Sequence, residues 1–328
     1  MTSTRSAPPT SICFAPPLAQ RFDADFADWR LIAFNVGPDG ALFGLWVPRI
    51  DDRNDRHDAS RTRTAGGARR YRVVSQRECV RALDLVVDDA PMELHDAQPL
   101  GEDVLLVGGR CRRFANGNAE ANGRIYGADG AFRRAIVLGD GIGAVQTARD
   151  GRIWTGYFDE GVIGNLGWTS PLGASGLVGW DDDGAIRYRY SPPAGTDAIL
   201  DCYAINVADD AVWCYYYTDF PLVRIEHGRE TGVWRPEVRG AHGFAVGAGY
   251  ALFGGGYGDY DRIRLIALKD DGRCETLADF ALEDERGRRL PGHHCVGRGQ
   301  SLYFRNDEAI HRFDIGTALR LVRERRGH

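Results

Sequence analysis

The sequence predicts an all-β protein: a single β-propeller of six four-stranded blades, with seven blades as the alternative. Three observations predict it. Glycine is abundant (42 of 328 residues) while methionine is scarce (2), a strand–turn–strand pattern recurs along the chain, and several strands are apolar on both faces. Glycines combined with many aromatic residues suit short strands joined by tight turns better than helices. All-β folds also often reach this length as one domain.

The recurring unit is a short apolar strand, a Gly or Asp turn, and a second apolar or aromatic strand. The clearest copy spans 144–158 around Asp150 and Gly151, and another spans 204–217 around Asp209. A second hairpin follows most copies, so each unit has four antiparallel strands over roughly 35 to 60 residues, near the period of a propeller blade. A long β-sandwich is the competing architecture, but it does not require six similar hairpin pairs.

Six such units fit the chain. They are expected at 29–90, 91–139, 140–196, 197–238, 239–289 and 290–323, with 1–28 as an N-terminal arm and 324–328 as a C-terminal tail. The run from Val212 to Tyr217 is apolar or aromatic at every position, which fits a strand buried on both faces between neighbouring blades. The longest insertion, at about 48–70, is interpreted as either a lid over the channel mouth or a disordered segment.

The segment Asp150-Gly-Arg-Ile-Trp-Thr-Gly resembles the Asp-Gly-x-Ile-Trp-x-Gly signature of bacterial propellers. These include the virginiamycin B lyase-like group and the periplasmic sensor propellers of histidine kinases. The architecture also resembles the six-bladed gluconolactonase and senescence-marker group. The resemblance implies a propeller over most of the chain and says less about function, because one fold hosts many activities.

Composition argues against several partners and locations. The net charge is −5, which gives no general attraction to nucleic acid. There is no apolar run long enough for a signal peptide or a membrane span. The seven cysteines form no CxxC pair, which excludes zinc-ribbon and thioredoxin-like spacings. We therefore expect a cytoplasmic protein that binds neither nucleic acid nor membranes.

Propeller geometry divides the loops between two faces. In each blade the turns after strands one and three lie on one face, here called the turn face. The link into strand one and the loop after strand two lie on the other, here called the linker face. The expected turn-face loops are plain turn formers such as 181–184, whereas the linker face collects four of the eight histidines and most acid–aromatic pairs. A ligand is therefore expected at the channel mouth on the linker face.

Candidate catalytic groups on this face are histidines and acids. His242 or His294 would act as general base, with Glu160 and Asp159 nearby. The gluconolactonase-like and lyase-like groups use a divalent cation, and this resemblance makes three oxygen-bearing residues candidate ligands for Ca, Mg, Mn or Zn: Asp201, Asn206 and Asp159. Metal-free acid–base chemistry by the same residues is equally open.

Two functions are compatible with these residues. The first is an enzyme acting on a small molecule, of hydrolase or lyase/isomerase type. Its expected substrate contacts are Tyr203, Tyr217, Asp219, Tyr257, Asp259, Trp168 and Arg110. The alternative is a non-catalytic propeller that binds a protein, peptide or glycan on the same face. Its tyrosines, Tyr260 among them, and Trp168 would then serve as anchors.

Overall fold

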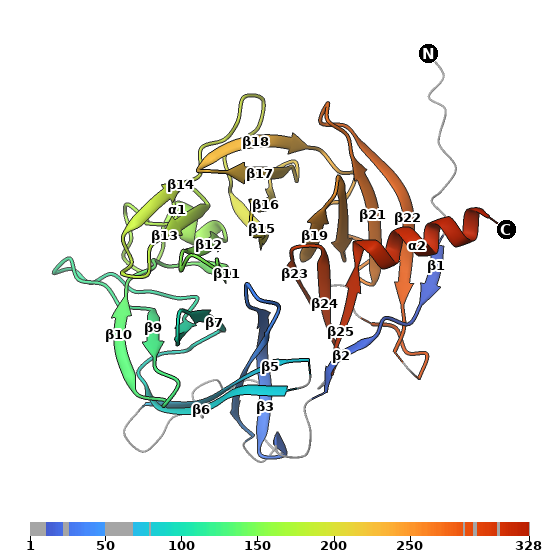
Figure 1. Cartoon of the computed structure of the whole chain (residues 1–328). Helices are drawn as coiled ribbons and strands as arrows, with labels where there is room; N and C mark the ends of the chain where they lie inside the picture. Colours follow the sequence, from blue (N-terminus) through green and yellow to red (C-terminus); the bar gives the residue numbers. More distant parts are fainter. Residues whose placement is uncertain are drawn as a thin grey trace.

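The computed structural model describes residues 11–21, 26–49, 68–78, 80–284, 286–290, 294–306 and 309–327. These residues form six sheets arranged as blades around a central channel, which confirms the predicted six-bladed propeller (Figure 1). Within each blade the strands follow one another outward from the channel. The proposed lid at 48–70 lies almost entirely outside the described residues, since β4 ends at Pro48 and β5 begins at Arg69.

The blades have the following strands. Blade one contains β3 (Trp29–Val36), β4 (Leu42–Pro48), β5 (Arg69–Arg77) and β6 (Val80–Ala90). Blade two contains β7 (Asp96–Leu100), β8 (Asp103–Val107), β9 (Gly123–Tyr126) and β10 (Phe132–Ile136). Blade three contains β11 (Ile142–Thr147), β12 (Ile153–Tyr157), β13 (Leu177–Trp180) and β14 (Ile186–Arg189). Blade four contains β15 (Asp201–Val207), β16 (Val212–Tyr217), β17 (Leu222–Glu226) and β18 (Arg229–Trp234). Blade five contains β19 (Gly243–Gly247), β20 (Tyr250–Gly254), β21 (Arg262–Leu268) and β22 (Cys274–Leu282).

The two ends of the chain close the ring. Blade six has three consecutive strands, β23 (Cys295–Arg298), β24 (Ser301–Asn306) and β25 (Ala309–Asp314), and its outer strand is β2 (Leu18–Arg21), antiparallel to β25. The preceding strand β1 (Ser11–Phe14) adds a fifth strand to blade five, parallel to β22 (Figure 1). The segment expected to be an arm thus supplies two strands. The helix α2 (Ile315–Arg326) occupies the positions expected to end blade six and form the tail.

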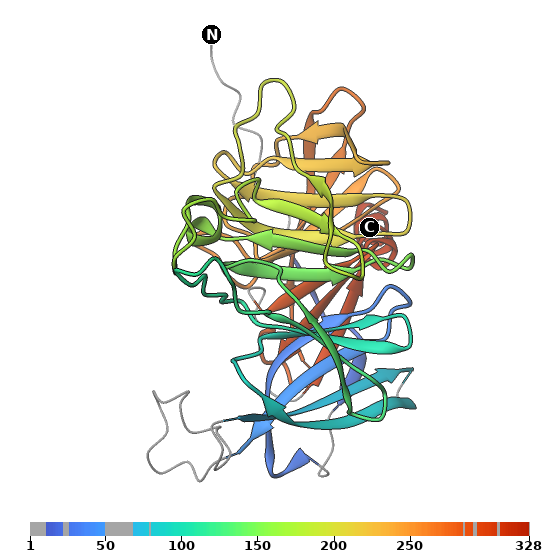
Figure 2. The ribbon, with the colours of Figure 1, turned by 90° about the vertical axis from the view of Figure 1, so that its left-hand side faces the viewer.

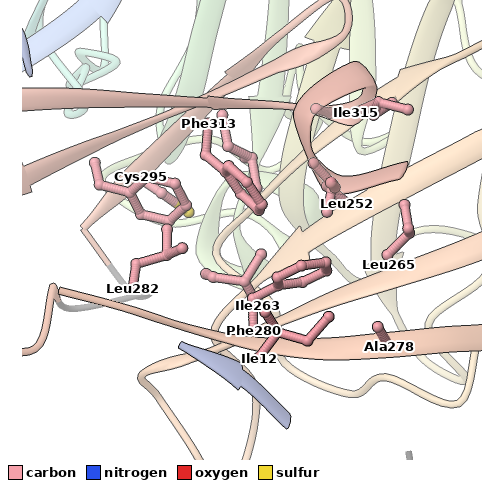
Figure 3. Packing of buried hydrophobic residues seen from close by; sticks show 14 of the residues in the cluster. Ile12, Leu252, Ile263, Leu265, Ala278, Phe280, Leu282, Cys295, Phe313 and Ile315 are labelled. Atoms are coloured by element: carbon pink, nitrogen blue, oxygen red, sulfur yellow. The ribbon is translucent and has the colours of Figure 1, made fainter. Parts of the chain in front are cut away.

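Apolar side chains between adjacent blades form the core. Between blades five and six, Ile263 and Phe280 pack with Phe313, whose ring lies 5.2 Å from that of Phe280 (Figure 3). Ile315, at the start of α2, joins the same cluster. Each such side chain contributes about 1.5–3 kcal/mol when fully buried. The predicted two-sided burial of β16 is confirmed, because every residue from Val212 to Tyr216 is buried.

Polar side chains of the inner strands join the blades across the channel. Gln146 donates through Nε2 to the Gly297 carbonyl (2.9 Å), and its Oε1 accepts from the Val207 amide (2.8 Å). Asn206 donates through Nδ2 to the Phe244 carbonyl (2.9 Å). Because blades three and six lie opposite each other in a six-membered ring, the bond from Gln146 crosses the channel. Buried polar groups paired in this way hold the inner strands in register.

No membrane-spanning element is present among the described helices, since neither is long and apolar enough to cross a bilayer.

Candidate functional site

Figure 2 shows the propeller edge-on, so that its two faces lie to the left and right. The linker face carries the short helix α1 (Asp159–Ile163), which follows β12, together with the loops that follow the second strand of the other blades. Most sequence-predicted site residues lie on this face, and the structure brings together those of blades three, four and five.

Four aromatic residues on the linker face form a cluster, here called the tyrosine cluster: Tyr203, Tyr217, Phe220 and Tyr257. The Phe220 ring lies at its centre, with ring centroids 5.1 Å from Tyr203, 5.8 Å from Tyr217 and 5.7 Å from Tyr257. The hydroxyls of Tyr203 and Tyr257 are hydrogen-bonded to each other, which links blade four to blade five. Phe220 is only 2% exposed, whereas Tyr217 and Tyr257 are 41% and 51% exposed. The cluster therefore presents aromatic surface to solvent on a buried support.

The loop after β16 adopts a costly backbone conformation to place Phe220. Both Asp219 (φ 49°) and Phe220 (φ 54°) lie in the left-handed region, which costs an L-residue roughly 1–2 kcal/mol. Burial of the Phe220 ring against Tyr215, at 5.3 Å, offsets this cost. Beside the loop, Asp219 lines a small pocket of about 50 Å³. Strained loop residues held by a packed aromatic are typical of binding sites.

Two carboxylates adjoin the tyrosine cluster. Asp201 is the cross-strand neighbour of Tyr217 in the β15–β16 pair. Burial, followed by the negative charge of Asp159, raises the pKa of Asp201. Asp159 stands at the start of α1, where its Oδ1 accepts from the Glu160 amide (2.7 Å). Within the described ranges neither carboxylate forms an ion pair, so Asp159 and Asp201 make one acidic patch beside exposed aromatic rings.

Three other predicted site residues have structural roles at the edge between blades two and three. Arg110 pairs with buried Asp140 (Nε to Oδ1, 3.0 Å) and with Glu160 (Nη1 to Oε2, 2.7 Å). The pKa of Glu160 is lowered, first by a hydrogen bond from Asn165 and then by the Arg110 charge. Trp168 is only 7% exposed and donates through Nε1 to the Cys111 carbonyl (2.7 Å). These side chains are thus engaged within the fold, and Trp168 is not presented to solvent.

The two predicted histidines also lie on the linker face. His242 precedes β19 and is exposed, with its ring centroid 6.2 Å from that of Tyr260. His294 is exposed, and its carbonyl accepts from the Arg305 amide (2.9 Å). Asp259 is exposed, its Oδ2 lies 3.9 Å from Arg262 Nη1, and it lines a separate pocket of about 370 Å³.

The three predicted metal ligands are not brought together. Asn206 lies five residues from Asp201 in β15, about 17 Å at the usual strand rise. Its amide is already engaged, since Nδ2 donates to Phe244 and Gly299 carbonyls and Oδ1 accepts from the Gly299 amide (2.8 Å). Among the residues that the structure describes, no group of three or more His, Cys, Asp or Glu side chains is arranged to hold a metal ion. Asp201 and Asp159 are the two members that remain close.

Sequence reasoning missed one contributor. Phe220 organises the tyrosine cluster, and the aromatic-rich stretch from Tyr215 to Phe220 was the available signal. Asp96 lies in the channel, where Asn35 Nδ2 donates to its Oδ1 (2.9 Å) and the Ala97 amide donates to the same oxygen (2.7 Å). Burial outweighs these bonds and raises the pKa of Asp96 to about 7. The adjacent His95 turns away, its Nδ1 accepting from the Gly109 amide (3.1 Å), so the two do not form an acid–base pair.

Comparisons with known proteins give a family match over part of the chain and structural matches over most of it. The model of the YxzG family matches residues 191–313, which is less than half of the sequence. A search of curated proteins finds no match. Among solved structures, the computationally designed Ika8 protein is 12% identical, with a TM-score of 0.46 over 88% of this chain and 72% of that one. The extracellular domain of the putative hybrid two-component system BT4673 from B. thetaiotaomicron is 10% identical, with a TM-score of 0.46; the match covers 91% of this chain and 39% of that one.

Proposed function

We propose that this chain is a ligand-binding propeller that holds a cationic group at the tyrosine cluster. The group would be an ammonium or guanidinium carried by a small molecule or peptide. One observation carries the proposal: exposed Tyr217 is the cross-strand neighbour of Asp201, whose pKa is raised by burial and by the charge of Asp159, and neither carboxylate has an ion-pair partner in the described part of the chain.

Both components favour the same ligand chemistry. The face of an aromatic ring attracts a cation by about 0.5–2 kcal/mol, and tyrosine is enriched at binding hot spots because its contact area is large and rigid. A bound cation would also neutralise the repulsion between Asp159 and Asp201, which contributes to the raised pKa of Asp201. Buried Phe220 holds the surrounding rings in place, so little side-chain freedom is lost on binding.

A second candidate is an acid–base enzyme at the same site. It is favoured by Asp201 and Asp159, neighbouring carboxylates of which Asp201 has a raised pKa. Such pairs divide the roles of proton donor and acceptor. The cation-assisted chemistry of the lyase-like and gluconolactonase-like propellers would need ligands other than Asn206, because its amide is bound to the backbone.

Isothermal titration calorimetry with L-arginine methyl ester tests the binding proposal. L-citrulline methyl ester is the matched neutral ligand. We expect the arginine ester to bind at least about tenfold more tightly than the citrulline ester, and Tyr257→Ala and Asp201→Asn each to weaken binding by about tenfold. Phe132→Ala is the control, since Phe132 is an exposed aromatic on the outer strand of blade two.

Equal affinity for the two esters, or wild-type affinity in both site variants, would refute the cation-binding proposal. Hydrolysis of the arginine ester that is lost in Asp201→Asn would instead support the enzyme.

A further inference from the structure

A larger cavity opens on the turn face, at the end of the channel opposite the tyrosine cluster. Its volume is about 990 Å³, and its walls come from the turns after the first strand of blades one, three, four, five and six, together with residues near the start of α2. The turn formers of these loops gave no sequence signal for a site. The size is at the upper end of the range for small-molecule pockets, about 300–1,000 Å³.

Arg298 lines this cavity at the end of inner strand β23. It is only 9% exposed. Its Nη2 donates to the Thr147 carbonyl (2.7 Å) and its Nη1 to Gln146 Oε1 (3.2 Å), and both of these acceptors are neutral. Within the described residues no carboxylate lies within 4 Å of this guanidinium. Burial lowers the pKa of Arg298 to about 10, which leaves it cationic at neutral pH.

The other charged side chains of the cavity are two ion pairs, one further arginine and the acids Glu78, Asp210 and Asp314. Arg149 Nε lies 2.7 Å from Asp209 Oδ1, and Arg77 Nη1 lies 3.6 Å from Asp39 Oδ2. Arg312 Nε donates to Ser301 Oγ (3.0 Å) and, in the part of the chain described, forms no ion pair. Arg298 and Arg312 both belong to blade six, as does Asp314, whose Oδ1 accepts from the Thr317 amide (2.8 Å) at the start of α2.

A buried guanidinium bound only to neutral acceptors is not fully compensated for the loss of water. An oxyanion would supply the missing charge and accept hydrogen bonds from the guanidinium. We propose that the turn-face cavity binds a small molecule through a carboxylate or phosphate group placed against Arg298.

The rim restricts the size of that ligand. Asp39 and Asp209 line the cavity and are exposed, as is Asp210. Their negative charges repel an extended polyanion such as nucleic acid, while a single oxyanion can reach the arginines of blade six. The site is separate from the tyrosine cluster, so its test is independent of the function proposed above.

The test is isothermal titration calorimetry with inorganic phosphate and, separately, with succinate, at an ionic strength held constant with sodium chloride. We expect saturable binding of at least one anion, and the tighter of the two identifies the preferred group. Arg298→Gln should weaken it roughly ten- to hundredfold. Arg187→Gln is the matched control, because Arg187 pairs with Asp181 on the outer strand of blade three.

Absence of saturable binding by either anion, or unchanged affinity in Arg298→Gln, would overturn the proposal. If Arg298→Gln fails to fold, the wild-type protein decides instead. A phosphate- or succinate-dependent shift of the Arg298 Nε–H NMR resonance supports the site, and an unchanged resonance overturns it.

Discussion

Replacing Asp96 with Asn should stabilise the folded protein at neutral pH. The carboxyl of Asp96 faces the channel and accepts from Asn35 Nδ2 and from the Ala97 amide. Asparagine retains one oxygen that can accept these bonds and removes the charge. Burial is the main cause of the raised pKa of Asp96, so the ionised form is the disfavoured state in the folded protein.

The size of this stabilisation follows from the pKa of Asp96. The pKa rises from 3.8 to about 7 on folding, and each unit corresponds to about 1.36 kcal/mol. The folded state therefore binds this proton more tightly than the unfolded state. Ionised Asp96 destabilises the fold by up to about 4 kcal/mol above pH 7, and this penalty declines as the pH falls toward 3.8. Because the side chain is only partly buried, solvent screening lowers the expected effect to about 1–3 kcal/mol.

Urea unfolding at several pH values measures the free energies of unfolding of the wild type and of Asp96→Asn. Subtracting the wild-type free energy of unfolding from that of Asp96→Asn cancels the other titrating groups. The difference should be positive near pH 8 and fall toward zero near pH 4. Asp210→Asn, which changes an exposed acid, should show no such trend. A difference that is independent of pH, or that grows as the pH falls, would refute the reasoning.

Three further predictions concern packing and closure. Gly297→Ala should destabilise the protein strongly, because a Cβ there would lie 1.7 Å from the Phe244 carbonyl oxygen. Gly143→Ala is the control, because a Cβ at Gly143 would make only ordinary van der Waals contacts. Equal melting temperatures of the two variants would contradict the prediction. Phe220→Ala should lower the free energy of unfolding by about 3–5 kcal/mol, measured in urea, whereas a loss below about 1 kcal/mol would show that the tyrosine cluster does not depend on this ring. Deleting residues 1–21 removes β1 and β2 and should lower the melting temperature in a thermal scan; an unchanged melting temperature would show that these strands do not close the ring.

The fold was predictable because its signals are local. Each hairpin is encoded within about 15 residues by apolar strands and a Gly or Asp turn, as around Asp150. The two-sided apolar run of β16 further distinguishes strands packed between blades from a half-exposed sheet. Six repeats of such a unit leave few alternative architectures.

The closure of the ring was not predictable in the same way. β2 pairs with β25, nearly three hundred residues later in the chain, and a four-residue strand near Pro17 carries no signal for so distant a partner. Likewise, α2 was not distinguished from the end of a blade, although Asp314 caps it by accepting from the Thr317 amide (2.8 Å).

The candidate site was predictable only in part. Residue types and loop positions placed Tyr203, Tyr217 and Tyr257 on one face, but they did not show that these rings meet around Phe220. The role of Asn206 depended on which backbone groups lie across the channel, and no sequence pattern reports that. The turn-face cavity was missed for the same reason. No other candidate site residue lies near Arg298 in the sequence, and its hydrogen-bond partners Gln146 and Thr147 belong to blade three.

Amide hydrogen exchange with and without L-arginine methyl ester tests the central claim most directly, because it reports where a ligand binds on the whole molecule. We expect slower exchange at 201–203, 217–220 and 255–260 on the linker face, and weaker protection of these segments in Tyr257→Ala at the same ester concentration. Protection confined to the turn face, or no protection under conditions in which the ester binds, would contradict it.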